Sequence, residues 1–120
     1  MKTKTKIKVG GVSNYSWMRI LDVLTEDDRI SKVLLFGSRA MGNFKPSSDI
    51  DLAVVGKELD FKEILSLRAR LGLLKISLKT DLVVYNNLPP DHPLRKHIDR
   101  VGIVIWEREP QPEPLNTPVQ

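Results

Sequence analysis

The chain has 120 residues, a hydrophobic fraction of 41% and a net charge of +4, and it contains no cysteine. This length suits one compact domain with its own core. The lack of cysteine excludes disulfides, thiolate catalysis and cysteine zinc sites, and it is compatible with a reducing cytoplasm, the expected location. No apolar run approaches the roughly 20 residues of a transmembrane helix, so no membrane association is expected.

The positive charge is concentrated in an N-terminal arm. Lys2, Lys4, Lys6 and Lys8 account for the whole excess, because the other 15 basic residues are balanced by 15 acidic ones. A nucleic-acid-binding surface would carry its charge on the folded body, so nucleic acid is not an expected partner. The alternation of lysine with Thr, Ile or Val over residues 2–9 is typical of an edge strand, with a solvated arm as the alternative.

The first half of the chain predicts one helix and two buried strands. Ser13 is a candidate N-cap for a helix, and the apolar residues behind it recur at helical spacing: Trp17, Ile20, Leu21 and Leu24. Continuous apolar runs predict strands at 33–36 and 50–55, each followed by a glycine. A helical turn is expected to begin at Gly37-Ser38.

The second half alternates helices and strands again. Asp60 and Glu63 form a capping-box pattern, and the helix behind them is expected to bury Phe61, Ile64, Leu65 and Leu71. Strands are predicted near 82–85 and 101–106. Asp91 is the expected cap of a short helix that carries Pro93 in its first turn. The alternation predicts an α/β fold built on a mixed sheet.

The last segment, residues 108–120, has a different composition. It contains four prolines and few aliphatic side chains, so it cannot bury enough surface to offset its ordering entropy. An extended tail is expected there. The predicted organisation is therefore a basic arm or edge strand over 1–12, one domain over 13–107 and a proline-rich tail over 108–120.

Two features at strand ends indicate phosphate and metal chemistry. Gly37-Ser38 follows a buried strand, where glycine allows close backbone approach, free N–H groups favour anions and the hydroxyl adds a donor. Asp49 and Asp51 lie two residues apart on a strand and therefore share a face. Paired carboxylates repel unless a cation lies between them, and oxygen ligands suit Mg²⁺. Asp81 opens a later strand and could complete a two-metal site.

This pattern, Gly37-Ser38, ten residues, then Asp49-x-Asp51 with a third acid at Asp81, resembles the nucleotidyltransferase superfamily typified by polymerase beta. It is most similar to the minimal members that pair with HEPN-domain partners and act as antitoxins. The resemblance implies the nucleotidyltransferase fold, two Mg²⁺ ions and ATP as substrate. It also implies transfer of AMP to a hydroxyl of a HEPN toxin, which is protein AMPylation.

The resemblance also implies roles for single residues. Gly37 and Ser38 would hold the β- and γ-phosphates, while Asp49 and Asp51 would bind the metals. Asp81 would be a metal ligand or the base for the attacking hydroxyl. We add two neighbours of the motif, Arg39 and Ser48, as candidate nucleotide contacts; for Arg39 a merely solvated position is the equal alternative.

Several alternatives stay open at this point. A nucleotidyltransferase acting on a small molecule or an RNA end is one, and a non-catalytic subunit that neutralises a toxin by binding alone is another. The intact acid triad favours catalysis over binding alone. His92 and His97 could serve as a metal pair or a general base, but we interpret both as exposed helix residues near Arg95 and Lys96.

Overall fold

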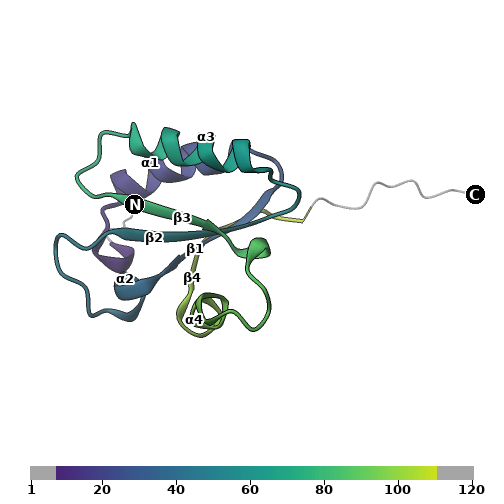
Figure 1. The fold of residues 1–120 in the computed structure, drawn as a ribbon. Helices are drawn as coiled ribbons and strands as arrows, with labels where there is room; N and C mark the ends of the chain where they lie inside the picture. The colour runs from purple at the N-terminus through teal and green to yellow at the C-terminus, as the bar shows by residue number, and fades with distance from the viewer. Residues whose placement is uncertain (1–7, 111–120) are drawn as a thin grey trace, which may run out of the picture.

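The structure, a computed structural model, describes residues 8–110. Within them the chain forms a four-stranded mixed sheet with the strand order β3-β2-β1-β4 (Figure 1). The strands are β1 (Ile30–Phe36), β2 (Ile50–Gly56), β3 (Thr80–Val84) and β4 (Ile103–Glu107). β1 pairs antiparallel with both β2 and β4, whereas β2 and β3 are parallel. The predicted α/β fold with a mixed sheet is confirmed.

Helices cover both faces of this sheet. α1 and α3 lie over one face, and α4 lies against the other (Figure 1). α3 is the crossover that the parallel pair of β2 and β3 requires. The helical segments are η1 (Val9–Gly11), α1 (Asn14–Leu24), α2 (Gly37–Met41), α3 (Phe61–Gly72), η2 (Tyr85–Asn87) and α4 (Pro93–Val101). No helix among residues 8–110 has the length and apolar character needed to cross a membrane.

Side-chain caps fix where the longer helices begin. The Ser13 hydroxyl accepts a hydrogen bond from the backbone of Ser16 at 3.1 Å, and the predicted capping box between Asp60 and Glu63 is present. The predicted Asp91 cap of α4 is wrong. His92 caps this helix instead, since its Nδ1 accepts the Leu94 amide at 3.0 Å. Proline fits the first helical position, so the cap falls on the residue directly before it.

Alternation along β2 divides the interior into two clusters. Leu52 joins the main core beneath α1 and α3, whereas Ala53 joins a smaller cluster with Phe36 and Ile98 beneath α4. Successive side chains of a strand point to opposite faces, so Asp51 lies on the same face as Ala53. The middle of the sheet is thus buried on both sides, and Asp51 lies on the face that α4 covers.

The core-facing stripe of α3 differs from the prediction. Ile64, Leu67 and Leu71 are buried, whereas Phe61 is 70% exposed and Leu65 is 44% exposed. Spacings of three and four residues place Ile64, Leu67 and Leu71 on one stripe, whereas Leu65 lies only two residues from Leu67 and Phe61 is the first residue of the helix. Phe61 and Leu65 therefore contribute to the outer surface of the helix.

Several strand boundaries differ from the prediction, and β1 and β3 begin earlier, at Ile30 and Thr80. Tyr85 begins η2 rather than ending β3, because the chain turns so that Asn86 Oδ1 accepts the Gly56 amide at 2.8 Å. α4 continues through Val101, so β4 begins at Ile103 rather than at residue 101. The four predicted strands all exist, but these edges depend on contacts between distant residues.

The start of the described chain is helical rather than extended. Residues 1–7, which contain most of the lysine arm, lie outside the described residues. Val9, predicted to lie in an edge strand, belongs to η1. Its carbonyl accepts a hydrogen bond from Trp17 Nε1 at 3.0 Å. The indole thus satisfies its polar group while its ring joins the core, as the helical spacing predicted.

The other end is anchored further along than predicted. Arg108, the expected first residue of the tail, donates to the carbonyl of Ile30 at 3.1 Å and to that of Thr25 at 3.3 Å. Its guanidinium also lies 4.8 Å from the ring centroid of Trp106. These contacts hold the residue after β4 against β1 and the loop that follows α1. The rest of the predicted tail, residues 111–120, lies outside the described residues.

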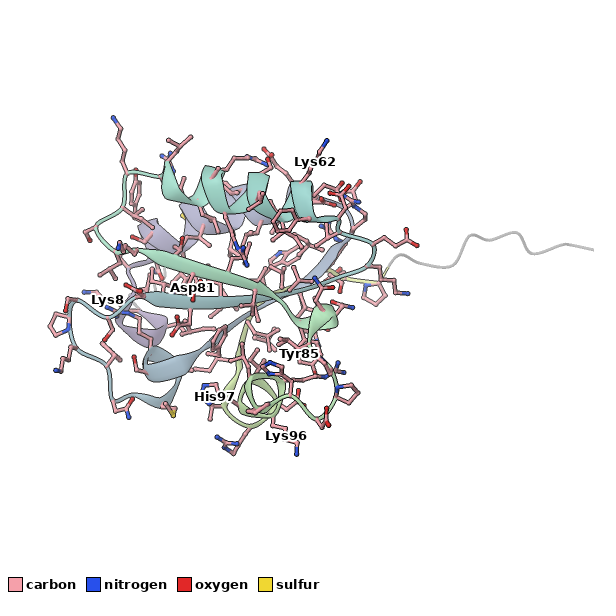
Figure 2. All side chains as sticks on the ribbon, in the orientation of Figure 1. Lys8, Lys62, Asp81, Tyr85, Lys96 and His97 are labelled. Carbon is pink, nitrogen blue, oxygen red and sulfur yellow. The ribbon has the colours of Figure 1, made fainter. Side chains whose placement is uncertain are left out.

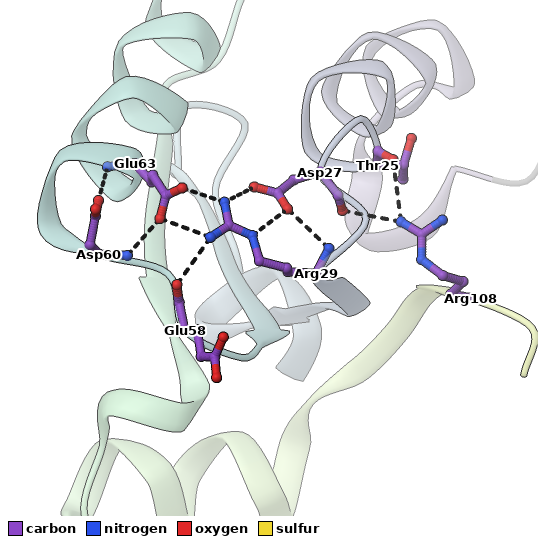
Figure 3. A network of polar contacts seen from close by, with 7 residues as sticks. All are labelled: Thr25, Asp27, Arg29, Glu58, Asp60, Glu63 and Arg108. Carbon is purple, nitrogen blue, oxygen red and sulfur yellow. Dashed lines mark hydrogen bonds and ion pairs between the residues drawn. The ribbon is translucent and has the colours of Figure 1, made fainter.

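Arg29 joins the loop after α1 to the beginning of α3 (Figure 3). Its guanidinium contacts the carboxylates of Asp27 at 2.8 Å and Glu63 at 3.0 Å, and it donates to the carbonyl of Glu58 at 3.1 Å. These hydrogen bonds from Arg29 hold the pKa of Asp27 and the pKa of Glu63 below their ordinary values. Glu63 serves this network and the capping box of α3 together.

The two lowered pKa values predict a specific acid sensitivity. A carboxyl group with a lowered folded-state pKa stabilises the fold above its unfolded pKa, and the contribution is lost as the pH falls through the folded pKa. The ordinary values are 3.8 for Asp27 and 4.5 for Glu63. We therefore expect Arg29→Gln to be less stable at neutral pH and to lose less stability than wild type on acidification below 4.5.

Urea unfolding at a series of pH values measures this difference. Arg19→Gln is the matched control, because Arg19 is exposed and contacts the exposed ring of Tyr15. An Arg29→Gln variant with the same acid response as wild type would contradict the assignment.

Candidate active site

Two carboxylates lie on neighbouring strands at the same end of the sheet. Asp51 of β2 is the direct register partner of Asp81 of β3, which Figure 2 labels. Each is the second residue of its strand, and paired residues of parallel strands project from the same face. Asp49 lies two residues before Asp51, and its charge acts on that carboxylate. The structure thus pairs Asp51 with Asp81 and places Asp49 close enough for its charge to act on Asp51.

Asp51 is half-buried among like charges. Burial raises the pKa of its carboxyl group above the ordinary value, and the charges of Asp81 and Asp49 raise this pKa further. His97 acts in the opposite direction. A cation placed among these carboxylates would offset their repulsion. The electrostatics therefore favour a bound divalent metal ion.

The acids have the right chemistry for Mg²⁺ and form an open site. Within residues 8–110, no group of three or more His, Asp or Glu side chains is arranged to hold a metal ion by itself. Asp49 and Asp81 are exposed, while Asp51 is half-buried. Mg²⁺ commonly binds one or two carboxylates and takes its other ligands from water and substrate phosphates. The donors therefore fit a metal whose coordination is completed by a nucleotide.

Gly37 brings the end of β1 against the carboxylate of Asp51. Its φ angle of +73° lies in the left-handed region that favours glycine. A Cβ atom at this position would lie 2.1 Å from Oδ2 of Asp51. A larger residue could fit only if the carboxylate moved. The backbone proposed to contact phosphate and the carboxylate proposed to bind metal therefore adjoin one another.

His97 enters the site from α4, and the prediction of an exposed helix residue is wrong. It is half-buried, and its Nε2 accepts a hydrogen bond from the Gly37 amide at 3.1 Å (Figure 2). Its ring meets Phe36 edge-on, with the ring centroids 6.0 Å apart. Helical spacing could have revealed it, because His97 lies three residues after Leu94 and directly before the buried Ile98.

Arg39 has a structural environment that differs from the expected contact with a nucleotide. The residue is only 3% exposed. Its guanidinium donates to the carbonyl oxygens of Gly10 at 2.9 Å, Pro46 at 3.0 Å and Ser48 at 2.9 Å. The ring centroid of Phe44 lies 4.6 Å from the guanidinium carbon. Arg39 thus ties the loop between α2 and β2 to η1.

The two serines of the predicted nucleotide site differ in their surroundings. The Ser48 hydroxyl accepts the Lys45 amide at 2.9 Å and so supports the same loop. Ser38 is half-buried, and no partner within residues 8–110 is found for its hydroxyl. The Ser38 hydroxyl is therefore free to donate to a bound anion. Neither serine has been tested as a nucleotide contact, so these roles stay predictions.

Comparison with known proteins gives two sequence relationships. A family model described as polymerase beta, nucleotidyltransferase matches residues 18–111, a range that includes all three acids. A putative protein adenylyltransferase of Methanocaldococcus jannaschii is 41% identical over 56 residues. That alignment covers 47% of this chain and 54% of the other. The chain thus spans about half the length of the curated relative it matches.

Solved structures share the fold. A toxin-antitoxin crystal structure with AMP-PNP gives a TM-score of 0.62 at 23% identity, covering 79% of this chain and 73% of that one. A tri-AMPylated HEPN toxin of Shewanella oneidensis in complex with MNT antitoxin gives 0.59 at 22% identity, covering 78% and 71%. A putative minimal nucleotidyltransferase gives 0.55 at 28% identity, covering 83% and 98%.

The raised pKa of Asp51 predicts that its charge destabilises the fold when no cation is bound. A carboxyl group with a raised folded-state pKa lowers stability above that pKa, and the cost disappears as the pH falls through it. Asp51→Asn should therefore be more stable than wild type at pH 7, with a gain that vanishes below the ordinary value of 3.8. Urea unfolding measures the gain, and Asp22→Asn on the exposed side of α1 is the control. Equal or lower stability at pH 7 would contradict the electrostatic account.

The buried contacts of Arg39 predict a large effect on stability. Arg39→Met should lower the free energy of unfolding by about 3 kcal/mol, because three partly buried carbonyl groups lose a charged donor. The exposed control Arg19→Met should change it by no more than about 0.5 kcal/mol. Denaturant unfolding checks both values. A stable Arg39→Met variant that no longer binds ATP would instead support the predicted contact between Arg39 and the nucleotide.

Proposed function

This chain belongs to the polymerase beta nucleotidyltransferase family, and from that premise we propose that it transfers AMP from ATP to a hydroxyl group of a partner protein. The observation that carries the proposal is the register pair of Asp51 and Asp81, with Gly37 packed against it. Nucleotidyl transfer consists chiefly of positioning phosphates and offsetting charge around one phosphorus atom. Both requirements can be met at this end of the sheet.

Each site residue has a defined part in this proposal. Gly37 and Ser38 bind the β- and γ-phosphates through a backbone amide and a free hydroxyl. Asp49 and Asp51 would hold Mg²⁺, with Asp81 as a further ligand or as the acceptor of the proton of the attacking hydroxyl. Bound Mg²⁺ would offset the negative charge of the reacting phosphate. The open arrangement of the acids leaves room for a hydroxyl from outside the chain.

We place this hydroxyl on a HEPN-domain toxin, so that the chain acts as its antitoxin. The curated relative is named as a protein adenylyltransferase, and one of the similar folds was solved with a tri-AMPylated HEPN toxin. AMP attached to such a toxin would add bulk and negative charge to it. Catalytic modification, rather than binding alone, is therefore the proposed route of neutralisation.

Co-expression with a HEPN-type partner tests the proposal. Intact-mass spectrometry should find the partner carrying AMP when it is produced with wild type, and unmodified when it is produced with Asp51→Asn. Asp22→Asn should modify the partner as wild type does, because Asp22 lies on α1 and outside the site. The outcome that favours binding alone is an unmodified partner with wild type, together with continued neutralisation by Asp51→Asn.

A further inference from the structure

The two edges of the sheet differ in how their backbone groups are occupied. At the β3 edge, Arg68 Nε and Nη2 donate to the carbonyl of Leu82 at 3.1 and 2.9 Å, so a side chain already holds this edge. At the opposite edge, β4 pairs with β1, and its outer side has no hydrogen bond in the part of the chain that the structure describes (Figure 1). Free backbone groups along a strand can pair with a further strand. β4 is therefore the open edge of this sheet.

Side chains at the start of β4 are exposed on both faces of the sheet. Ile103 is 36% exposed and Val104 is 48% exposed. Their register partners, Leu35 and Leu34, pack in the two separate core clusters, so the two exposed side chains project toward opposite faces. A helix laid on one face could cover only one of them. A strand added in the plane of the sheet would cover both, because its own side chains alternate in the same way.

The charges around β4 favour a second copy of this chain as the added strand. Residues 103–106 carry no charge, so two copies of this stretch do not repel each other. Arg100 is exposed just before the strand and Glu107 is exposed at its end. Arg100 has no ion pair within residues 8–110, and Glu107 has one long contact of 3.8 Å, with Lys32. An antiparallel copy brings the basic end of each strand toward the acidic end of the other, which makes the edge complementary to itself.

We propose that two copies of the chain associate through their β4 strands, antiparallel and about a two-fold axis. Directly opposite residues of antiparallel strands share a face, and this restricts the register. Val104 opposite its own copy, with Ile103 opposite Ile105, meets the condition because Ile103 and Ile105 both lie on the side of the main core. The two four-stranded sheets then form one continuous sheet.

This interface leaves the candidate active site uncovered. Asp51 and Asp81 lie on β2 and β3, and β1 separates these strands from β4. Because the β4 strands run antiparallel, the two sites of the dimer lie at opposite ends of the joined sheet. The inference depends on the open edge alone and not on the reaction proposed above.

Cysteine cross-linking tests the register directly, because the chain contains no cysteine of its own. Opposite residues of antiparallel strands have Cα atoms about 4.5–5.5 Å apart, a separation that a disulfide can bridge. Val104→Cys should give a disulfide-linked dimer under mild oxidation. Ile103→Cys and Ile105→Cys should cross-link when they are mixed, and far less when each is alone. Leu73→Cys, at a position that is 80% exposed, is the control and should stay monomeric.

Sedimentation velocity of the full chain measures the association without a cross-link. Wild type should shift from monomer to dimer as its concentration rises. Val104→Lys should weaken the dimer about tenfold or more, because it places like charges opposite each other, whereas Leu73→Lys should not. Arg100→Glu should weaken it about tenfold, and the exchange of Arg100→Glu together with Glu107→Arg should restore most of the loss. Lys96→Glu, also exposed on α4, should have little effect.

Four results would overturn the proposal. One is a wild-type chain that stays monomeric at every concentration, and another is Val104→Cys that cross-links no faster than Leu73→Cys. A third is equal weakening of the dimer by Lys96→Glu and Arg100→Glu, which would place the contact elsewhere. The fourth is a monomer in which the amides of Ile103 and Val104 are both protected from hydrogen exchange, because the edge would then be covered by a segment of the same chain.

Discussion

Two carboxylates that repel each other are held side by side by the register of β2 and β3. Asp51 and Asp81 would separate if each were free in solution. They stay paired because the residues that follow them are apolar and buried, with Leu52 beside Leu82 in the main core. The hydrophobic energy of the strands therefore maintains an electrostatic arrangement that is unfavourable by itself. A cation bound at this end of the sheet would offset the repulsion that folding imposes.

Much of this arrangement could be predicted from the sequence, because its determinants are local. The apolar runs at β1, β2 and β3 are unbroken, and each begins or ends at a glycine or an acid. The spacing of Asp49 and Asp51 places them on one face of any strand. The position of Asp81 beside them required one further assumption, that β2 and β3 are neighbours. The crossover through α3 satisfies this assumption.

The residues whose surroundings the sequence did not predict depend on contacts between distant segments. Arg39 follows the phosphate-binding pair in sequence, yet its partners are carbonyls of η1 and of the following loop, such as Gly10 and Ser48. His97 looks like a surface residue until α4 is packed against the end of β1. No local pattern indicates which carbonyls or amides a long side chain will reach. Secondary structure and strand-end chemistry could be deduced, whereas these tertiary hydrogen bonds could not.

The Gly37 amide donates a hydrogen bond to His97 of α4, so the imidazole competes with any anion for this amide. A phosphate oxygen that accepts this N–H displaces the imidazole. The apparent affinity for the phosphate is therefore the intrinsic affinity multiplied by the fraction of molecules in which the amide is free. Displacement also removes a link between α4 and the start of α2. Filling of the phosphate position would therefore change how α4 is held against the end of β1.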